Sequence, residues 1–155
     1  MIRRLAGVLL ALTVALVACS SDEATLPAIE LERLGGGTLD LAAATGEPRV
    51  LNLWATWCAP CRAELPAFDR VAASSPNIEI VGINIGDSAE AASELVEELG
   101  LSFPQALDPD AEVQVGLKIT GMPATIFLDP DGDLIEIHNG ELEEDELRAL
   151  LDEHY

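Results

Sequence analysis

Apolar runs of strand length alternate with amphipathic segments of helix length along much of the chain. The run from Arg49 to Ala55 (RVLNLWA) is apolar at nearly every position and too short for a helix, as expected of a strand buried on both faces. Ile78 to Ile85 (IEIVGINI) is rich in β-branched residues and predicts a second central strand. A helical pattern follows each of these strands. This order predicts an α/β domain with a parallel core.

Three segments have apolar residues at helical spacing. The first extends from Ala59 to Ala73, where Pro66 predicts a kink, and the last extends from Glu143 to Glu153. The middle segment starts with a capping box at Asp87 (DSAE) and stops at Gly100. In chain order, the apolar faces consist of Leu65, Phe68 and Val71, then Ala91, Leu95, Val96 and Leu99, then Leu147, Leu150 and Leu151.

Two pairs of short runs predict β-hairpins. Ala28 to Arg33 and Thr38 to Leu41 flank three consecutive glycines, which adopt positive φ without steric cost, so a hairpin is expected ahead of the main domain. Ala124 to Leu128 and Leu134 to His138 flank the sequence DPDGD, which is a strong turn signal. The second hairpin is expected at the edge of the sheet.

The first 18 residues have the layout of an export signal. Arg3 and Arg4 precede the stretch from Leu5 to Ala18, in which Thr13 is the only polar residue. A helix needs about 20 residues to span a bilayer, so this 14-residue stretch is typical of a signal-peptide core rather than of a membrane span. Residues 1–18 are therefore predicted to be a signal peptide.

The segment Leu16-Val17-Ala18-Cys19 resembles the lipobox of bacterial lipoproteins. The resemblance implies that Cys19 is diacylated and anchors the protein, outside the cytoplasm, to a bacterial envelope membrane. Residues 19–27 would then form a lipidated tether, which fits their small, polar and acidic character, and residues 28–155 would form the folded domain. The alternative is an ordinary thiol at Cys19 beside an ordinary cleavage site.

The charge balance bears on the partners. The 155 residues carry a formal charge of −20, which becomes −22 when Arg3 and Arg4 leave with the signal. Nucleic acid is excluded as a partner, because phosphate binding needs clusters of basic residues and Lys118 is the single lysine. The acidity fits either a solvated surface or a salt-rich medium. A content of 49% hydrophobic and 23% charged residues is that of a globular protein.

Two cysteines lie where the first buried strand gives way to a helix, in Trp57-Cys58-Ala59-Pro60-Cys61. Thiols at a helix N-terminus experience its positive pole, which lowers the pKa of the exposed thiol. Cys58 is therefore predicted to attack, and Cys61, one turn further on, to resolve the mixed disulfide. A zinc site is disfavoured because zinc takes four protein ligands and the sequence has no second cysteine pair. A static structural disulfide is the remaining alternative.

The segment VLNLWATWCAPCRAELP resembles the active-site segment of thioredoxin-like proteins, and most closely that of the TlpA/ResA branch of extracytoplasmic thiol-disulfide oxidoreductases. Gly121 to Thr125 (GMPAT) resembles the cis-proline loop of the same family. The two matches imply a thioredoxin-like α/β fold for the domain, with a central mixed sheet flanked by helices and an extra N-terminal β-hairpin.

The resemblance also implies roles for individual residues. Thioredoxin has a buried aspartate where this chain has Asn52, whereas Glu64 matches a glutamate of the TlpA/ResA branch that acts as general base toward the inner thiol. A cis bond before Pro123 would turn the peptide of Met122 toward the cysteines, where it can pair with a substrate backbone. Trp57 would form one wall of that groove.

These features predict a membrane-tethered, extracytoplasmic enzyme that exchanges dithiol for disulfide with protein substrates. No metal or other cofactor is required, since the cysteine pair carries both electrons. The family suggests a monomeric reductase of the cytochrome c maturation type, supplied by a membrane electron donor. An oxidase of exported proteins and a copper-delivery protein of the same superfold are alternatives. A peroxide-reducing site would need Thr-X-X-Cys, whereas Thr56 stands only two residues before Cys58.

Overall fold

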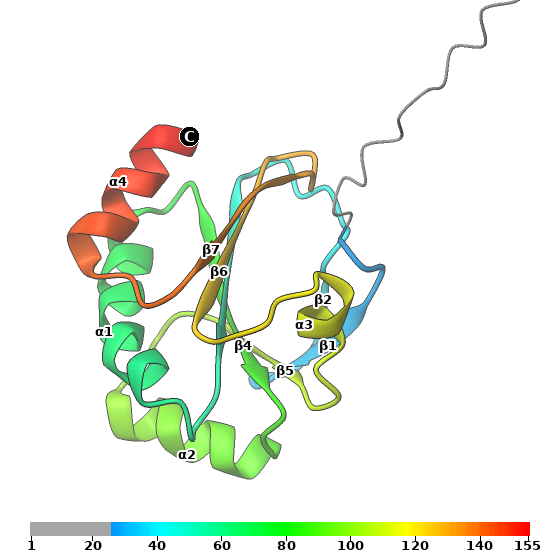
Figure 1. Cartoon of the computed structure of the whole chain (residues 1–155), viewed down its shortest axis with the longest axis vertical. Helices are drawn as coiled ribbons and strands as arrows, with labels where there is room; N and C mark the ends of the chain where they lie inside the picture. The colour runs from blue at the N-terminus through cyan, green and yellow to red at the C-terminus, as the bar shows by residue number, and fades with distance from the viewer. Residues whose placement is uncertain (1–25) are drawn as a thin grey trace, which may run out of the picture.

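A seven-stranded mixed sheet forms the centre of residues 26–155, the part of the chain that this computed structural model describes (Figure 1). The strand order is β2-β1-β5-β4-β3-β6-β7. β3 pairs parallel with β4 and antiparallel with β6. The strands are β1 (Glu30–Arg33), β2 (Thr38–Asp40), β3 (Arg49–Trp54), β4 (Glu79–Ile85), β5 (Gln105–Asp108), β6 (Ala124–Leu128) and β7 (Leu134–Asn139). The helices are α1 (Ala59–Ser74), α2 (Ala89–Leu99), α3 (Glu112–Gly116) and α4 (Glu144–His154).

Both expected hairpins are confirmed. β1 and β2 pair antiparallel at one side of the sheet, and β6 and β7 pair antiparallel at the other. The turn between β6 and β7 is held by the Asp129 side chain, whose Oδ1 accepts hydrogen bonds from the backbone N–H groups of Asp131 and Asp133. Gly132 takes a φ of +88° in this turn, which a residue with a side chain would adopt only with strain.

The sequence pattern misses two elements and misplaces one helix cap. β5 and α3 have only four and five residues, which is too short for a periodic signal. The expectation of a capping box at Asp87 is wrong, because Ser88 is the N-cap of α2 and its side chain accepts the Ala91 N–H. Asp87 instead bonds the loop before α1, as described below.

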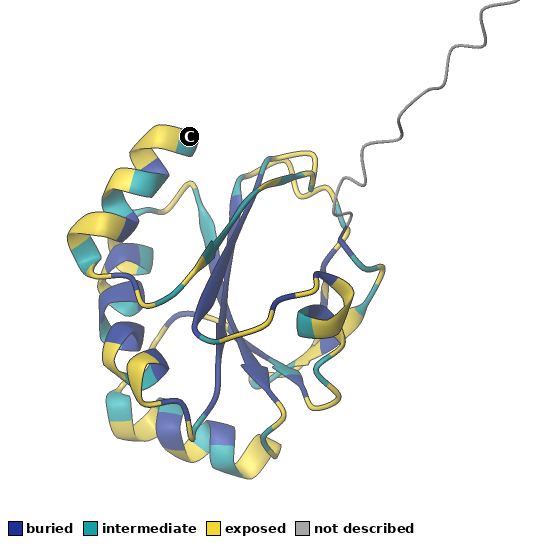
Figure 2. Cartoon of the chain, in the orientation of Figure 1, coloured by how far each residue is buried: buried dark blue, intermediate teal, exposed yellow. Residues whose placement is uncertain are grey.

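The sheet divides the apolar core into two layers, one on each of its faces. α1, α2 and α4 pack on one face of the sheet, whereas α3 and the N-terminal residues pack on the other (Figure 1). Because side chains alternate along a strand, Val50 and Trp54 of β3 face the α1 layer, whereas Leu51 and Leu53 face the opposite layer. Figure 2 shows the central strands buried between these layers. α1 continues through Pro66 without a break.

The N-terminal features of the sequence fall largely outside the described residues. The predicted signal peptide, Cys19 and most of the tether precede residue 26. Leu26 is only 8% exposed and belongs to the core, and Pro27 packs closely against Gly116. Between residue 26 and the last residue, no helix combines the length and the apolarity that crossing a bilayer requires.

Candidate active site

The first turn of α1 carries the cysteine pair. Cys58 is the N-cap of the helix, with an extended backbone, and its Sγ accepts a hydrogen bond from the Cys61 N–H at 3.3 Å. Pro60 suits the first turn, where a missing N–H leaves no bond unmade. The Sγ of Cys58 therefore lies among the free N–H groups at the positive end of α1, which is where a thiolate is stabilised.

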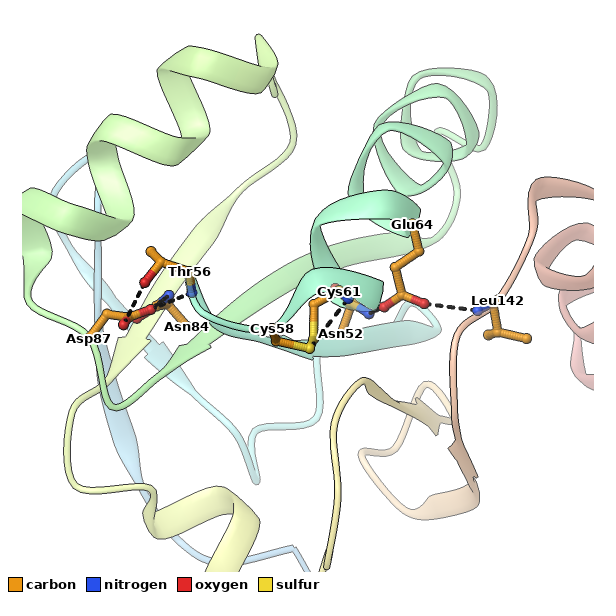
Figure 3. Close-up of a disulfide and its surroundings, with 8 residues drawn as sticks. All are labelled: Asn52, Thr56, Cys58, Cys61, Glu64, Asn84, Asp87 and Leu142. Carbon is orange, nitrogen blue, oxygen red and sulfur yellow. Dashed lines mark hydrogen bonds between the residues drawn. A yellow bond between two sulfur atoms is a disulfide. The ribbon is translucent and has the colours of Figure 1, made fainter.

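Cys58 and Cys61 form a disulfide, with their Cα atoms 5.3 Å apart (Figure 3). Cys58 is 5% exposed and Cys61 is fully buried. Both contribute to the apolar layer beneath α1 together with Leu65 and Phe68. The outer position of Cys58 agrees with its expected role as the attacking thiol, although only a narrow part of it is accessible in the oxidised protein.

Glu64 is a buried carboxylate one helical turn after Cys61. It is 2% exposed, and each of its oxygens accepts one hydrogen bond (Figure 3). The Asn52 Nδ2 donates to Oε1 at 2.7 Å, and the Leu142 N–H donates to Oε2 at 2.8 Å. Burial raises the pKa of Glu64 from 4.5 to about 7, and the nearby charge of Glu141 adds to the rise, while the two hydrogen bonds oppose it. Glu64 can therefore gain and lose a proton near neutral pH.

Sequence reasoning identified Glu64 but not its partners. The resemblance marks Asn52 only as the position where thioredoxin has an aspartate, whereas in the structure the Asn52 amide donates a hydrogen bond to the Glu64 carboxylate. The other partner, the backbone of Leu142, lies 78 positions after Glu64 in the chain, and only the packing of α4 against α1 brings it close to Glu64. No local sequence signal could have indicated this contact.

A second cluster of polar side chains, formed by Thr56, Asn84 and Asp87, anchors the loop before the cysteines (Figure 3). The Asp87 Oδ2 accepts hydrogen bonds from the Thr56 N–H at 2.7 Å and from the Asn84 Nδ2 at 2.8 Å. The Asp87 Oδ1 accepts the Thr56 hydroxyl at 2.8 Å. These bonds tie the end of β3 to the end of β4, so the position of Trp57 and Cys58 depends on a carboxylate that the sequence pattern had assigned to a helix cap.

The Met122–Pro123 loop lies between α3 and β6. The Met122–Pro123 peptide bond is cis, as the resemblance implied, and Pro123 is buried. Met122 packs against both apolar layers, one of which contains both cysteines. A groove of about 410 Å³ is lined by residues 117–123 together with Ile137, Asn139 and Gly140. Trp57 is 70% exposed and is the most accessible large aromatic side chain among residues 26–155.

Comparison with known proteins agrees with this fold and site. The AhpC/TSA family matches residues 23–137. The chain is 31% identical over 126 residues to the thiol-disulfide oxidoreductase ResA of Bacillus subtilis, a match that covers 80% of this chain and 70% of ResA. It is 31% identical over 129 residues to the thiol:disulfide interchange protein HelX of Rhodobacter capsulatus, covering 81% and 72% of the two chains.

A solved structure gives the same result. A secreted Mycobacterium tuberculosis disulfide oxidoreductase homologous to E. coli DsbE superposes with a TM-score of 0.73 at 29% identity, covering 81% of this chain and 96% of that one. The fold and the Cys-X-X-Cys disulfide are those of a thioredoxin-superfamily thiol-disulfide oxidoreductase. The chain belongs to the AhpC/TSA family, and within it to the oxidoreductases of the ResA, HelX and DsbE type.

The protonation of Glu64 is expected to make the stability of the oxidised protein depend on pH. The folded state holds this proton more tightly than the unfolded chain, so the contribution of Glu64 is fully present below about pH 4.5 and is lost as pH rises through about 7. The loss amounts to about 3 kcal/mol of unfolding free energy. Urea unfolding of wild type and Glu64→Gln across this range measures it. The two proteins should differ in slope, and parallel curves would contradict the assigned pKa.

Proposed function

We propose that this protein is an extracytoplasmic reductase of protein disulfides, which reduces partners such as the disulfides of haem-attachment motifs in cytochrome c maturation. The observation that carries the proposal is the buried Glu64 carboxylate, which titrates near neutral pH and lies one turn from the inner cysteine of the redox pair. Such a group serves an inner thiol that must lose its proton before it can attack. The similarity to ResA and HelX supports the same class of activity.

The reaction begins with the reduced protein. The Cys58 thiolate attacks one sulfur of the substrate disulfide, forms a mixed disulfide and releases the other substrate sulfur as a thiolate, which takes up a proton. Cys61 then gives its proton to Glu64 and attacks the Sγ of Cys58. The Cys58–Cys61 disulfide forms, the mixed disulfide breaks, and the second substrate sulfur leaves as a thiolate. Two electrons pass to the substrate, and Glu64 returns its proton to solvent or to the product thiolate.

The substrate is proposed to bind as an extended segment beside the cysteines. Met122 and Pro123 present backbone next to the apolar layer of the disulfide, and the adjoining groove of about 410 Å³ gives room for substrate side chains. Trp57, the residue directly before Cys58, offers an exposed aromatic surface for the substrate. In this role the protein acts as a monomer and receives electrons from a membrane donor.

The direction of transfer is tested by the equilibrium reduction potential of the Cys58–Cys61 pair, measured against glutathione. A reductase should lie near the thioredoxin end of the superfamily range, about −270 mV, whereas an oxidase of exported proteins should lie near the DsbA end, about −120 mV. A potential at the upper end would overturn the reductase assignment and favour the oxidase, without affecting the exchange chemistry itself.

We further propose that the protein is anchored outside the cytoplasm by a lipid on Cys19, behind a signal peptide of residues 1–18. The motif from Leu16 to Cys19 and the secreted relative in Mycobacterium tuberculosis support this location. A Cys19→Ala variant is expected to leave the membrane fraction while retaining dithiol activity, because the redox pair is Cys58 and Cys61, which both belong to the packed core of the domain. Fractionation and mass spectrometry of the N-terminal peptide measure this. Unchanged membrane retention with an unmodified peptide would rule out the anchor.

A further inference from the structure

Two buried oxygen atoms lie in the layer of Glu64 and the disulfide without a hydrogen-bond partner among the described residues. They are the Oδ1 of Asn52 on β3 and the Oγ1 of Thr125 on β6, and both residues are fully buried. Leaving such a group unsatisfied costs about 1–3 kcal/mol, so a pair of them beside a redox site needs a physical explanation.

Asn52 and Thr125 are neighbours on adjacent strands of the sheet. They are direct partners in the antiparallel register of β3 and β6. Side chains of such partners share one face, with Cβ atoms about 5 Å apart. That face is the α1 side, because Asn52 bonds Glu64 there and Phe127, two residues after Thr125, packs in the same layer. Thr125 therefore lies beside Asn52 on the face of the sheet where Asn52 bonds Glu64.

Protonation of Glu64 changes what its neighbours must supply. The ionised carboxylate accepts from Asn52 at Oε1 and from Leu142 at Oε2. Once protonated, one oxygen becomes a donor and needs an acceptor. The backbone N–H of Leu142 can only donate, so the proton belongs on Oε1, opposite Asn52. A half-turn of the Asn52 amide places its free Oδ1 there, and the amide keeps the same shape.

We propose that Asn52 and Thr125 are positioning residues: the Asn52 amide reverses its orientation when Glu64 takes up the proton of Cys61, and a hydrogen-bond chain of Glu64, Asn52 and Thr125 then forms. With Glu64 ionised, the Asn52 Nδ2 donates to the carboxylate, and the Asn52 Oδ1 and the Thr125 Oγ1 have no partner among the described residues, as in this structure. With Glu64 protonated, Oε1–H donates to the Asn52 Oδ1 and the Asn52 Nδ2 donates to the Thr125 Oγ1. The Thr125 hydroxyl can end this chain because its oxygen accepts a hydrogen bond.

The chain involves one proton and no change in covalent bonds other than its transfer from Cys61 Sγ to Glu64 Oε1. The inference rests on the proposed role of Glu64 as the proton acceptor. Asn52 and Thr125, on β3 and β6, are neutral, whereas Cys61 comes from α1 and the loop before α4 brings the charge of Glu141. His138 of β7 is the direct partner of Thr125 in the antiparallel register, so this ionisable side chain lies on the same face of the sheet. The cysteines do not titrate in the oxidised protein, and Glu64→Gln separates the charge of Glu64 from that of His138.

NMR of the oxidised, isotope-labelled full chain tests the reversal without any thiol exchange, so it stands even if the proposed substrate reaction fails. At about pH 9 the Asn52 side-chain amide protons should show nuclear Overhauser contacts to Glu64, and at about pH 5 they should show them to Thr125. The change should follow the titration of the Glu64 carboxyl carbon. Unchanged contacts at both pH values would overturn the proposal, as would a carboxyl carbon that does not titrate in this range.

Variants separate the reversing chain from a merely structural role. Asn52→Leu should raise the pKa of Glu64 by about one unit, because a hydrogen bond to a charged group is worth more than the neutral bond lost from the protonated form. Thr125→Val should lower this pKa, because the protonated state loses the acceptor that the reversed amide needs, and it should have no effect in the Asn52→Leu background, whereas Thr125→Ser should keep the wild-type value. Equal effects of Thr125→Val in both backgrounds would contradict the chain.

Two controls complete the experiment. In Glu64→Gln the side chain at position 64 cannot ionise, so the contacts of the Asn52 amide should no longer depend on pH. Asn84 is a second buried amide, whose Nδ2 donates to a carboxylate and whose Oδ1 has no partner among the described residues. It lies away from Glu64, in the cluster with Asp87 and Thr56 (Figure 3). Its signals report general effects of pH. A pH-dependent reversal at Asn52 that persists in Glu64→Gln would overturn the proposal.

Discussion

Replacing Cys61 with serine is expected to trap a mixed disulfide between Cys58 and the protein substrate and to lower turnover to the uncatalysed rate. Cys58 lies at the N-cap of α1, where the free N–H groups stabilise its thiolate, so the first attack remains possible. The second attack needs the buried Cys61 thiol, because no other cysteine lies among residues 26–155. The adduct should be stable to gel electrophoresis without reductant and should release both components on reduction.

The matched variant is Cys58→Ser, which keeps Cys61 but removes the outer thiol. It should give no adduct under the same conditions, because Cys61 is fully buried. Both variants are best prepared in a Cys19→Ala background, so that the third cysteine of the chain cannot form adducts of its own. If Cys58→Ser traps substrate and Cys61→Ser does not, the roles of the two thiols are reversed.

Replacing Glu64 with glutamine is expected to slow release of the substrate from the mixed disulfide by about 10²-fold, as for the loss of a general base. Glutamine keeps the size of the side chain but cannot accept the proton of Cys61. The wild-type rate should rise as pH increases through about 7, because the ionised carboxylate is the base, and the variant should lack this rise. Stopped-flow exchange with a disulfide peptide across pH measures both effects.

Glu97→Gln is the control for removal of one negative charge, since Glu97 is exposed on α2 and makes no side-chain hydrogen bond or ion pair within residues 26–155. It should behave like the wild type. An unchanged rate and pH profile in Glu64→Gln would reduce Glu64 to a buried structural group, and would leave water or a carboxylate of the partner as the proton acceptor.

The sequence predicts the position of the redox pair well, because the signals there are local. A buried apolar run ends just before Cys58, and helical spacing begins just after it, so the cysteines must lie at a strand-to-helix junction. The strands β3 and β4 follow from short apolar and β-branched runs, and both hairpins follow from pairs of short runs that flank turn residues. β5 and α3 could not be found this way, since elements of four or five residues hold no full period.

The chemistry around the cysteines depends on contacts that local patterns do not encode. Asp87 fits the sequence signature of a helix cap, yet Ser88 caps α2 and Asp87 bonds Thr56, 31 positions earlier, because the ends of β3 and β4 are adjacent in the sheet. Likewise, the pKa of Glu64 rises through burial beneath the loop that carries Leu142. The register that sets Thr125 opposite Asn52 comes from the pairing of β3 with β6.

The central claim is that Cys58 and Cys61 transfer two electrons to a disulfide, with Cys58 reacting first. The most direct measurement mixes the reduced protein with a disulfide peptide, quenches the reaction in acid at successive times, and identifies the linked cysteines by mass spectrometry after alkylation. The account predicts a transient adduct through Cys58, followed by the Cys58–Cys61 disulfide and one equivalent of peptide dithiol. An adduct through Cys61, or peptide that stays oxidised while both cysteines remain free, would contradict it.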